Sequence, residues 1–146
     1  MTTIKSYTDL QQSKKLAEIL PLESADYCWG IDDETLHYNN SPYPCAWKDY
    51  TCKEYYIPCW SLAALMNLLP SEFTEKGKYS ETTYHIDIRK YALTEDVDLY
   101  QIAYGNYKFY EDGNSSWKDM INTGEKENLI DAVFQMVIWL KENEKI

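Results

Sequence analysis

Apolar and polar residues alternate in some segments of the chain and follow a helical period in others, which together predict an α+β fold. Residues 83–93 show the clearest alternation, with Tyr84, Ile86 and Ile88 on one side of a strand and polar residues on the other. Further strands are expected over residues 27–31, 35–38 and 53–57, and a hairpin over residues 99–113. These strands predict a small antiparallel sheet.

Three helices are expected around this sheet. The first begins with a capping box at Thr8–Gln11 and stops at Pro21. The second, a buried central helix, starts at Pro58 and ends before Pro70, since proline is tolerated at a first helical position. The third covers residues 127–144 and is apolar on most sides, as expected of a core helix. We see no repeat or linker, so residues 1–146 are predicted to form one α+β domain.

The expected hairpin and the strand before it supply the candidate binding residues. Gly105–Asn106 is predicted at the hairpin turn, because glycine permits the mirror-image turn that matches strand twist. Alternating positions should then give one tyrosine-rich face, which either contacts a partner or packs on the C-terminal helix. The polar side of residues 83–93 offers donor and acceptor groups on a rigid strand. The residues predicted to contact a partner or small ligand are Tyr100, Tyr104, Tyr107, Tyr110, His85, Asp87 and Arg89.

The charge of the chain restricts its partners. It has 24 acidic and 14 basic residues, a formal net charge of −10, together with 14 tyrosines and 5 tryptophans. Such a surface repels phosphates and anionic lipid, so direct binding to nucleic acid or to a membrane surface is not expected. One alternative is mimicry of nucleic-acid charge, which requires the acidic turns at residues 32–34, 95–98 and 111–112 to form one continuous stripe.

The N-terminal sequence predicts a cytoplasmic protein. The first 20 residues never contain more than two consecutive apolar residues, whereas a signal peptide needs about 7–15. Cysteines stay reduced in the cytoplasm, so disulfides are not expected there.

Four cysteines raise the question of a metal site. Cys28, Cys45, Cys52 and Cys59 are separated by sixteen, six and six residues, so the short C-x₂₋₄-C spacing common in zinc sites does not occur. Free cysteine is among the most buried residue types. We therefore interpret Cys45, Cys52 and Cys59, each of which is near an aromatic residue, as buried thiols in an aromatic core, and expect no cofactor. The alternative is a metal site formed by the four cysteines with His37.

Cys59 also has a catalytic interpretation. The segment PCWSLAAL resembles the nucleophile segment of papain-type cysteine peptidases, where a helix N-terminus favours a thiolate. The resemblance implies Cys59 as nucleophile of a thiol hydrolase or transferase and His85 as base, oriented by Asp98 or Asn106. The segment departs from that family because no glycine precedes Cys59, and His85 follows after only 25 residues. We favour a buried thiol.

Three segments together resemble a family of short proteins of gut Bacteroidales genomes and their phages and mobile elements. They are SYTDLQQSKKLAEILPLESADY, IPCWSLAALMNLLP and LIDAVFQMVIWLKEN. The resemblance implies a genomic setting in which small acidic proteins often bind and modulate other molecules. Our leading hypothesis is a non-catalytic binding protein that acts on a host protein or a small ligand, as an inhibitor or a sponge.

Overall fold

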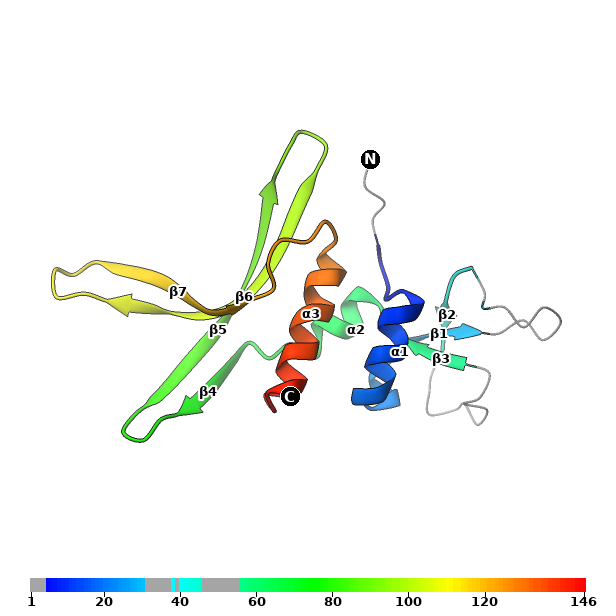
Figure 1. The fold of residues 1–146 in the computed structure, drawn as a ribbon, viewed down its shortest axis with the longest axis horizontal. Coiled ribbons are helices and arrows are strands. Elements are labelled where there is room, and N and C mark those ends of the chain that lie inside the picture. Colours follow the sequence, from blue (N-terminus) through cyan, green and yellow to red (C-terminus); the bar gives the residue numbers. More distant parts are fainter. Residues whose placement is uncertain (1–4, 31–37, 39, 46–55) are drawn as a thin grey trace. The chain divides into compact units, whose positions relative to one another are not determined.

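The computed structural model describes residues 5–30, 38, 40–45 and 56–146. Contacts along the chain divide it into two compact units, an N-terminal unit of residues 5–68 and a C-terminal unit of residues 69–146 (Figure 1). Helices and antiparallel sheets confirm the α+β class. The described residues form two sheets rather than the single small sheet predicted. The organisation of residues 1–146 as one domain stays a prediction.

The N-terminal unit contains short helices and a three-stranded antiparallel sheet with strand order β2-β1-β3. Its elements are α1 (Leu10–Ile19), a 3₁₀ turn (Leu22–Ser24), β1 (Tyr27–Gly30), β2 (Tyr43–Pro44), β3 (Tyr56–Cys59) and α2 (Leu62–Met66). Strand β1 confirms the strand predicted at 27–31, and β3 overlaps the one predicted at 53–57. The strand predicted at 35–38 lies almost entirely outside the described residues.

The capping box of α1 is one residue further along the chain than predicted. Asp9 is the N-cap, and its carboxylate accepts a hydrogen bond from the backbone N–H of Gln12 at 2.8 Å. The Gln12 side chain in turn accepts from the backbone N–H of Asp9 at 3.1 Å. Thr8 is buried instead, and its hydroxyl accepts from the backbone N–H of Trp60 at 3.1 Å. This long-range contact removes Thr8 from the cap.

The central helix is shorter than the sequence predicts. Helix α2 covers only Leu62–Met66, with Ser61 as its N-cap. Pro58 and Cys59 belong to β3, where they pair with Cys28 and Tyr27 of β1. Strand β3 lies at the edge of its sheet, which is the position that tolerates proline. Cys59 is therefore a strand residue, and the helix N-terminus that would favour its thiolate is absent.

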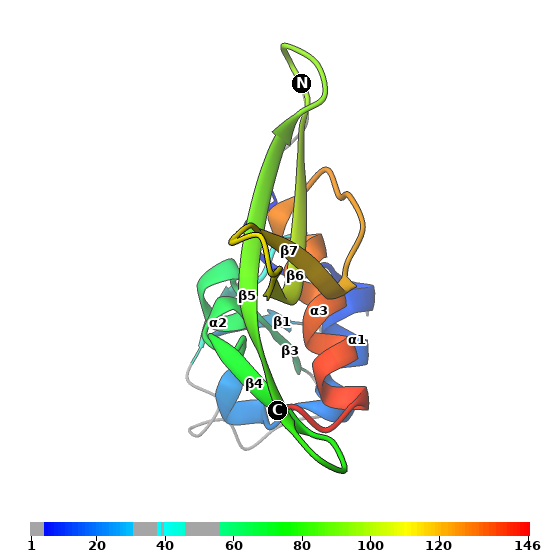
Figure 2. The same ribbon diagram turned by 90° about the vertical axis from the view of Figure 1, so that its left-hand side faces the viewer.

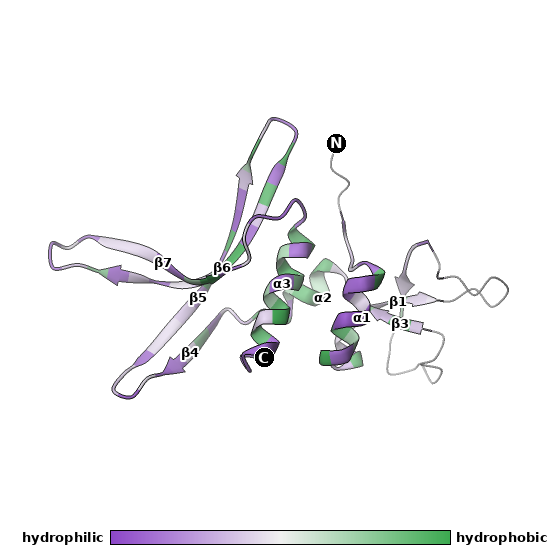
Figure 3. Ribbon diagram, in the orientation of Figure 1, coloured by the Kyte–Doolittle hydropathy of each residue, from purple (hydrophilic) through white to green (hydrophobic). Residues whose placement is uncertain are grey.

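The C-terminal unit is a four-stranded antiparallel sheet with a helix on one face. Its strands pair in the order β4-β5-β6-β7, and Figure 2 shows them in front of α3. The elements are β4 (Glu72–Lys76), β5 (Glu81–Ala92), β6 (Asp98–Phe109), β7 (Ser115–Asn122) and α3 (Leu129–Glu142). Helix α3 confirms the predicted core helix and is mostly hydrophobic in Figure 3. It buries Ile130, Val133, Met136, Val137 and Leu140.

The hairpin predicted around Gly105 is wrong. Residues 98–109 form one continuous strand, β6, and the turn to β7 falls at residues 110–114. Gly113 has a φ of 84° in this turn, which suits glycine. At Gly105 the register between β6 and β7 shifts, so Gly105 marks a β-bulge rather than a turn. The β5–β6 and β6–β7 hairpins point in different directions (Figure 1).

Candidate functional site

The four tyrosines predicted to bind a partner lie in different environments. Tyr104 is fully buried, with its ring centroid 5.0 Å from that of Phe73, and its hydroxyl donates to the backbone carbonyl of Pro70 at 2.6 Å. Burial raises the pKa of this hydroxyl. Tyr100 is partly exposed, and its backbone N–H and carbonyl both pair with Lys126. Tyr104 is thus a core residue, which corrects the predicted tyrosine face.

Aromatic side chains instead gather at the far end of the β6–β7 hairpin. Phe109 is 82% exposed, Tyr107 is 58% exposed and Tyr110 is 53% exposed. The Tyr107 ring meets the Trp117 ring edge-on, with 5.3 Å between the centroids. The Tyr110 hydroxyl bonds to Ser116 at 3.0 Å. We call Tyr107, Phe109, Tyr110 and Trp117 the aromatic cluster.

Gly105 fixes the position of Trp117 in this cluster. A Cβ atom at Gly105 would lie 2.9 Å from the Trp117 indole and would overlap the backbone carbonyl oxygen of Lys118. The absence of a side chain therefore lets the indole lie against the β6 backbone. The indole N–H donates to the carboxylate of Asp119 at 2.6 Å, which holds the ring in place.

Asp119 connects the aromatic cluster to a polar network on the same face of the sheet. Two N–H groups of Arg89 bind the Asp119 carboxylate, one of them at 2.9 Å. The Arg89 Nε also donates to Asp87 at 2.7 Å, and Nη1 donates to Gln101 at 3.3 Å. These contacts raise the pKa of Arg89, and Arg89 lowers the pKa of Asp119. The guanidinium of Arg89 therefore donates its hydrogen bonds to side chains of the protein itself.

The polar side of β5 is thus confirmed, but its residues have internal partners. His85, Asp87 and Arg89 occupy alternate positions of the strand, as predicted. His85 Nδ1 lies 3.1 Å from the carboxylate of Glu72 on β4. Asp87 binds Arg89, as described above. These contacts support the sheet, and the prediction that the three residues contact a ligand stays a prediction.

Cys59 lacks the environment of a nucleophile. It is fully buried, and its thiol donates to the backbone carbonyl of Thr8 at 3.4 Å. Burial raises the pKa of the thiol, which opposes thiolate formation. Cys59 belongs to the N-terminal unit and His85 to the C-terminal unit. The Asp98 carboxylate pairs with Lys90 at 3.0 Å. The catalytic interpretation of these three residues therefore gains no support.

The other cysteines fit the interpretation as buried thiols in part. Cys28 is buried and Cys45 is partly exposed, and both are free thiols. Burial and a hydrogen bond with Cys28 raise the pKa of Cys45 to about 12. Cys52 and His37 lie outside the described residues. Within the described ranges, no group of three or more His, Cys, Asp or Glu residues is arranged to hold a metal ion.

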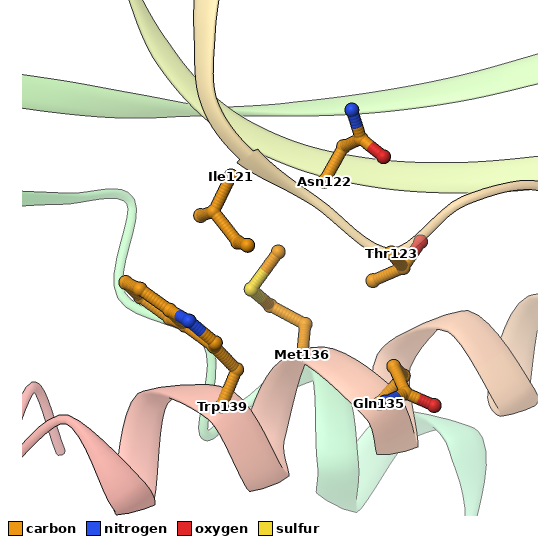
Figure 4. Close-up of a pocket in the computed structure, with 6 residues that line it drawn as sticks. All are labelled: Ile121, Asn122, Thr123, Gln135, Met136 and Trp139. Carbon is orange, nitrogen blue, oxygen red and sulfur yellow. The ribbon is translucent and has the colours of Figure 1, made fainter.

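A small cavity of about 120 Å³ lies between β7 and α3 (Figure 4). Ile121, Met136 and Trp139 point toward one another there, whereas the side-chain amides of Asn122 and Gln135 point away. The Asn122 amide donates to Asp119 at 3.3 Å. The cavity is apolar and small, so we interpret it as a packing niche of the core.

The acidic turns do not form one stripe in the C-terminal unit. Residues 95–98 lie at the end of the β5–β6 hairpin and residues 111–112 at the end of the β6–β7 hairpin, and these two ends diverge (Figure 1). The turn at residues 32–34 lies outside the described residues. This arrangement does not favour mimicry of nucleic-acid charge.

Comparisons with family models, curated proteins and solved structures found no match to this chain. In the part of the chain that the structure describes, none of the helices is long and apolar enough to cross a membrane.

Proposed function

We propose that the protein is a small, non-catalytic binding protein whose aromatic cluster docks on a partner protein. The observation that carries this proposal is the exposure of three aromatic residues at one end of one hairpin, with Phe109 at 82%. Aromatic residues supply most of the binding energy in many interfaces, because each buries a large area with few rotatable bonds. A group of them exposed together is characteristic of an interaction site.

The contacts that hold the aromatic cluster in place strengthen the proposal. Trp117 is fixed by Gly105 and Asp119, and Asp119 is fixed by Arg89. Tyr107 packs against Trp117 in turn. A binding surface that is ordered before the partner arrives loses little conformational entropy on binding, so more of the contact energy contributes to affinity.

The turn beside the cluster indicates the charge of the partner. Glu111 and Asp112 lie next to Tyr110 and are exposed, which favours a partner with an apolar pocket and basic side chains at its rim. The resemblance to proteins of phages and mobile elements suggests a host protein of the cytoplasm as this partner. The protein would then act as an inhibitor or sponge.

Affinity capture from a lysate of the bacterium that carries the gene tests this function. We expect the wild type to retain a partner that Phe109→Ser loses by at least about tenfold, because a central aromatic anchor typically contributes that much. Tyr79→Ser is the matched control, since Tyr79 is 89% exposed in the β4–β5 turn, away from the cluster. Equal retention by the wild type and Phe109→Ser would rule out the proposed surface.

A further inference from the structure

The opposite side of the β6–β7 hairpin has a second feature. A concave region of about 460 Å³ lies on the sheet face that Tyr104 and α3 occupy further along. Strands β5, β6 and β7 all contribute side chains to it. The region is lined by Thr82, Tyr84, Asn106, Lys108, Lys118 and Met120, together with Asp119. Its size falls in the range of small-molecule sites, about 300–1,000 Å³.

Two lysines stand side by side at this concavity. Asn106 and Lys118 pair across β6 and β7, and Lys108 follows Asn106 by two positions, so both ammonium groups are on the same face. Neither lysine takes part in an ion pair with any other described residue. Two lysines that form no ion pair among the described residues therefore face this concavity.

Apart from Asp119, the remaining polar groups of the concavity are donors that make no hydrogen bond to another residue that the structure describes. Among the described residues, no hydrogen bond is made by the hydroxyls of Thr82 and Tyr84 or by the side-chain amide of Asn106. The other face of the same sheet differs, because there Arg89 and Asp119 are bonded to several neighbours each. Asp119 also borders the concavity, but its carboxylate is already bound by Arg89.

We propose that this concavity binds a small organic anion, with its carboxylate or phosphate held by Lys108 and Lys118. The hydroxyls of Thr82 and Tyr84 and the Asn106 amide supply neutral donors to the same group. An apolar wall for the body of the ligand is provided by the Tyr84 ring and the Met120 side chain. The Tyr84 ring packs on the Phe73 ring, with 5.5 Å between their centroids.

An NMR titration of the ¹⁵N-labelled protein tests the site. The probes are 1-naphthyl phosphate and 1-naphthylacetate, with 1-naphthaleneethanol as the neutral analogue of similar size. We expect saturable shifts of the Asn106 and Lys118 amide signals with at least one anion, and at least about fivefold weaker binding of the alcohol. Binding of either anion supports the proposal. The ratio of the two affinities shows whether the site prefers phosphate or carboxylate.

The variants decide whether the lysines hold the anion. Replacing both Lys108→Gln and Lys118→Gln should weaken anion binding by about fivefold or more without changing the dispersion of the spectrum. The control, Lys76→Gln with Lys78→Gln, changes the net charge equally at exposed positions, at the end of β4 and in the β4–β5 turn, and should stay within about twofold. Equal binding of the alcohol, no saturable shift at Asn106 and Lys118, or the same loss in both double variants would overturn the proposal. None of these results depends on the aromatic cluster.

Discussion

Gly105→Ala is expected to lower the free energy of unfolding by about 2–4 kcal/mol and to displace the indole of Trp117. The added Cβ would overlap the backbone carbonyl oxygen of Lys118 and would lie 2.9 Å from the indole. A backbone oxygen cannot move aside without opening the β6–β7 pairing, so the cost is large. Urea unfolding measures the stability, and the NMR signal of the Trp117 indole N–H reports its bond to Asp119.

Gly113→Ala separates this effect from a general cost of replacing glycine in the hairpin. Gly113 has a φ of 84°, but nothing lies within 4 Å of an added Cβ. We expect a loss of about 1–2 kcal/mol from backbone strain alone, with the Trp117 indole signal unchanged. If Gly105→Ala left both the stability and the indole signal as in the wild type, the proposed contact between Gly105 and Trp117 would be wrong.

Arg89→Met is expected to cost about 2–3 kcal/mol near neutral pH. The substitution keeps much of the side-chain volume but leaves the carboxylates of Asp87 and Asp119 without their shared cation. We place the cost below that of a fully buried ion pair, because the Arg89 side chain is 21% exposed and water screens part of the charge. Lys90→Met is the control, since its exposed pair with Asp98 contributes little.

The cost of Arg89→Met should depend on pH. Arg89 lowers the pKa of Asp119 in the folded protein. A lowered carboxyl pKa contributes stability that is fully present above the unfolded value of about 4 and is lost as the pH falls through the folded value. The difference between the wild type and the variant should therefore shrink between pH 7 and pH 3. A difference that is the same at both values would show that Arg89 stabilises the sheet by packing alone.

Patterns that depend on one element were predicted well from the sequence. Alternation along residues 83–93 gave β5 and the shared face of His85, Asp87 and Arg89, and the apolar run near the C-terminus gave α3. In both cases one periodic signal extends along the element, over more than two turns of the helix and more than six positions of the strand. Such signals identify the type of element and the residues that share a face, although Ile88 on the apolar side of β5 is 42% exposed.

Features that depend on a distant partner could not be predicted. Pro58 suits either a helix start or an edge strand, and only its pairing with Cys28 decides between them. Gly105 suits either a turn or a bulge, and only the pairing of β6 with β7 decides between them. The error at Gly105 also moved the expected tyrosine face, which placed the buried Tyr104 on the surface and left Phe109 and Trp117 unnoticed. The signal that could have identified Phe109 and Trp117 was their position in alternating segments on either side of the true turn at residues 110–114.

The most direct test of the aromatic cluster as a partner-binding surface is photo-cross-linking in cells that carry the gene. A photoreactive phenylalanine analogue replaces Phe109 in one variant and Tyr79 in the other, since both side chains are highly exposed and lie at the ends of different hairpins. We predict one dominant protein adduct from position 109 and no such adduct from position 79. The same adducts from both positions, or a dominant adduct from position 79 alone, would contradict the proposed function.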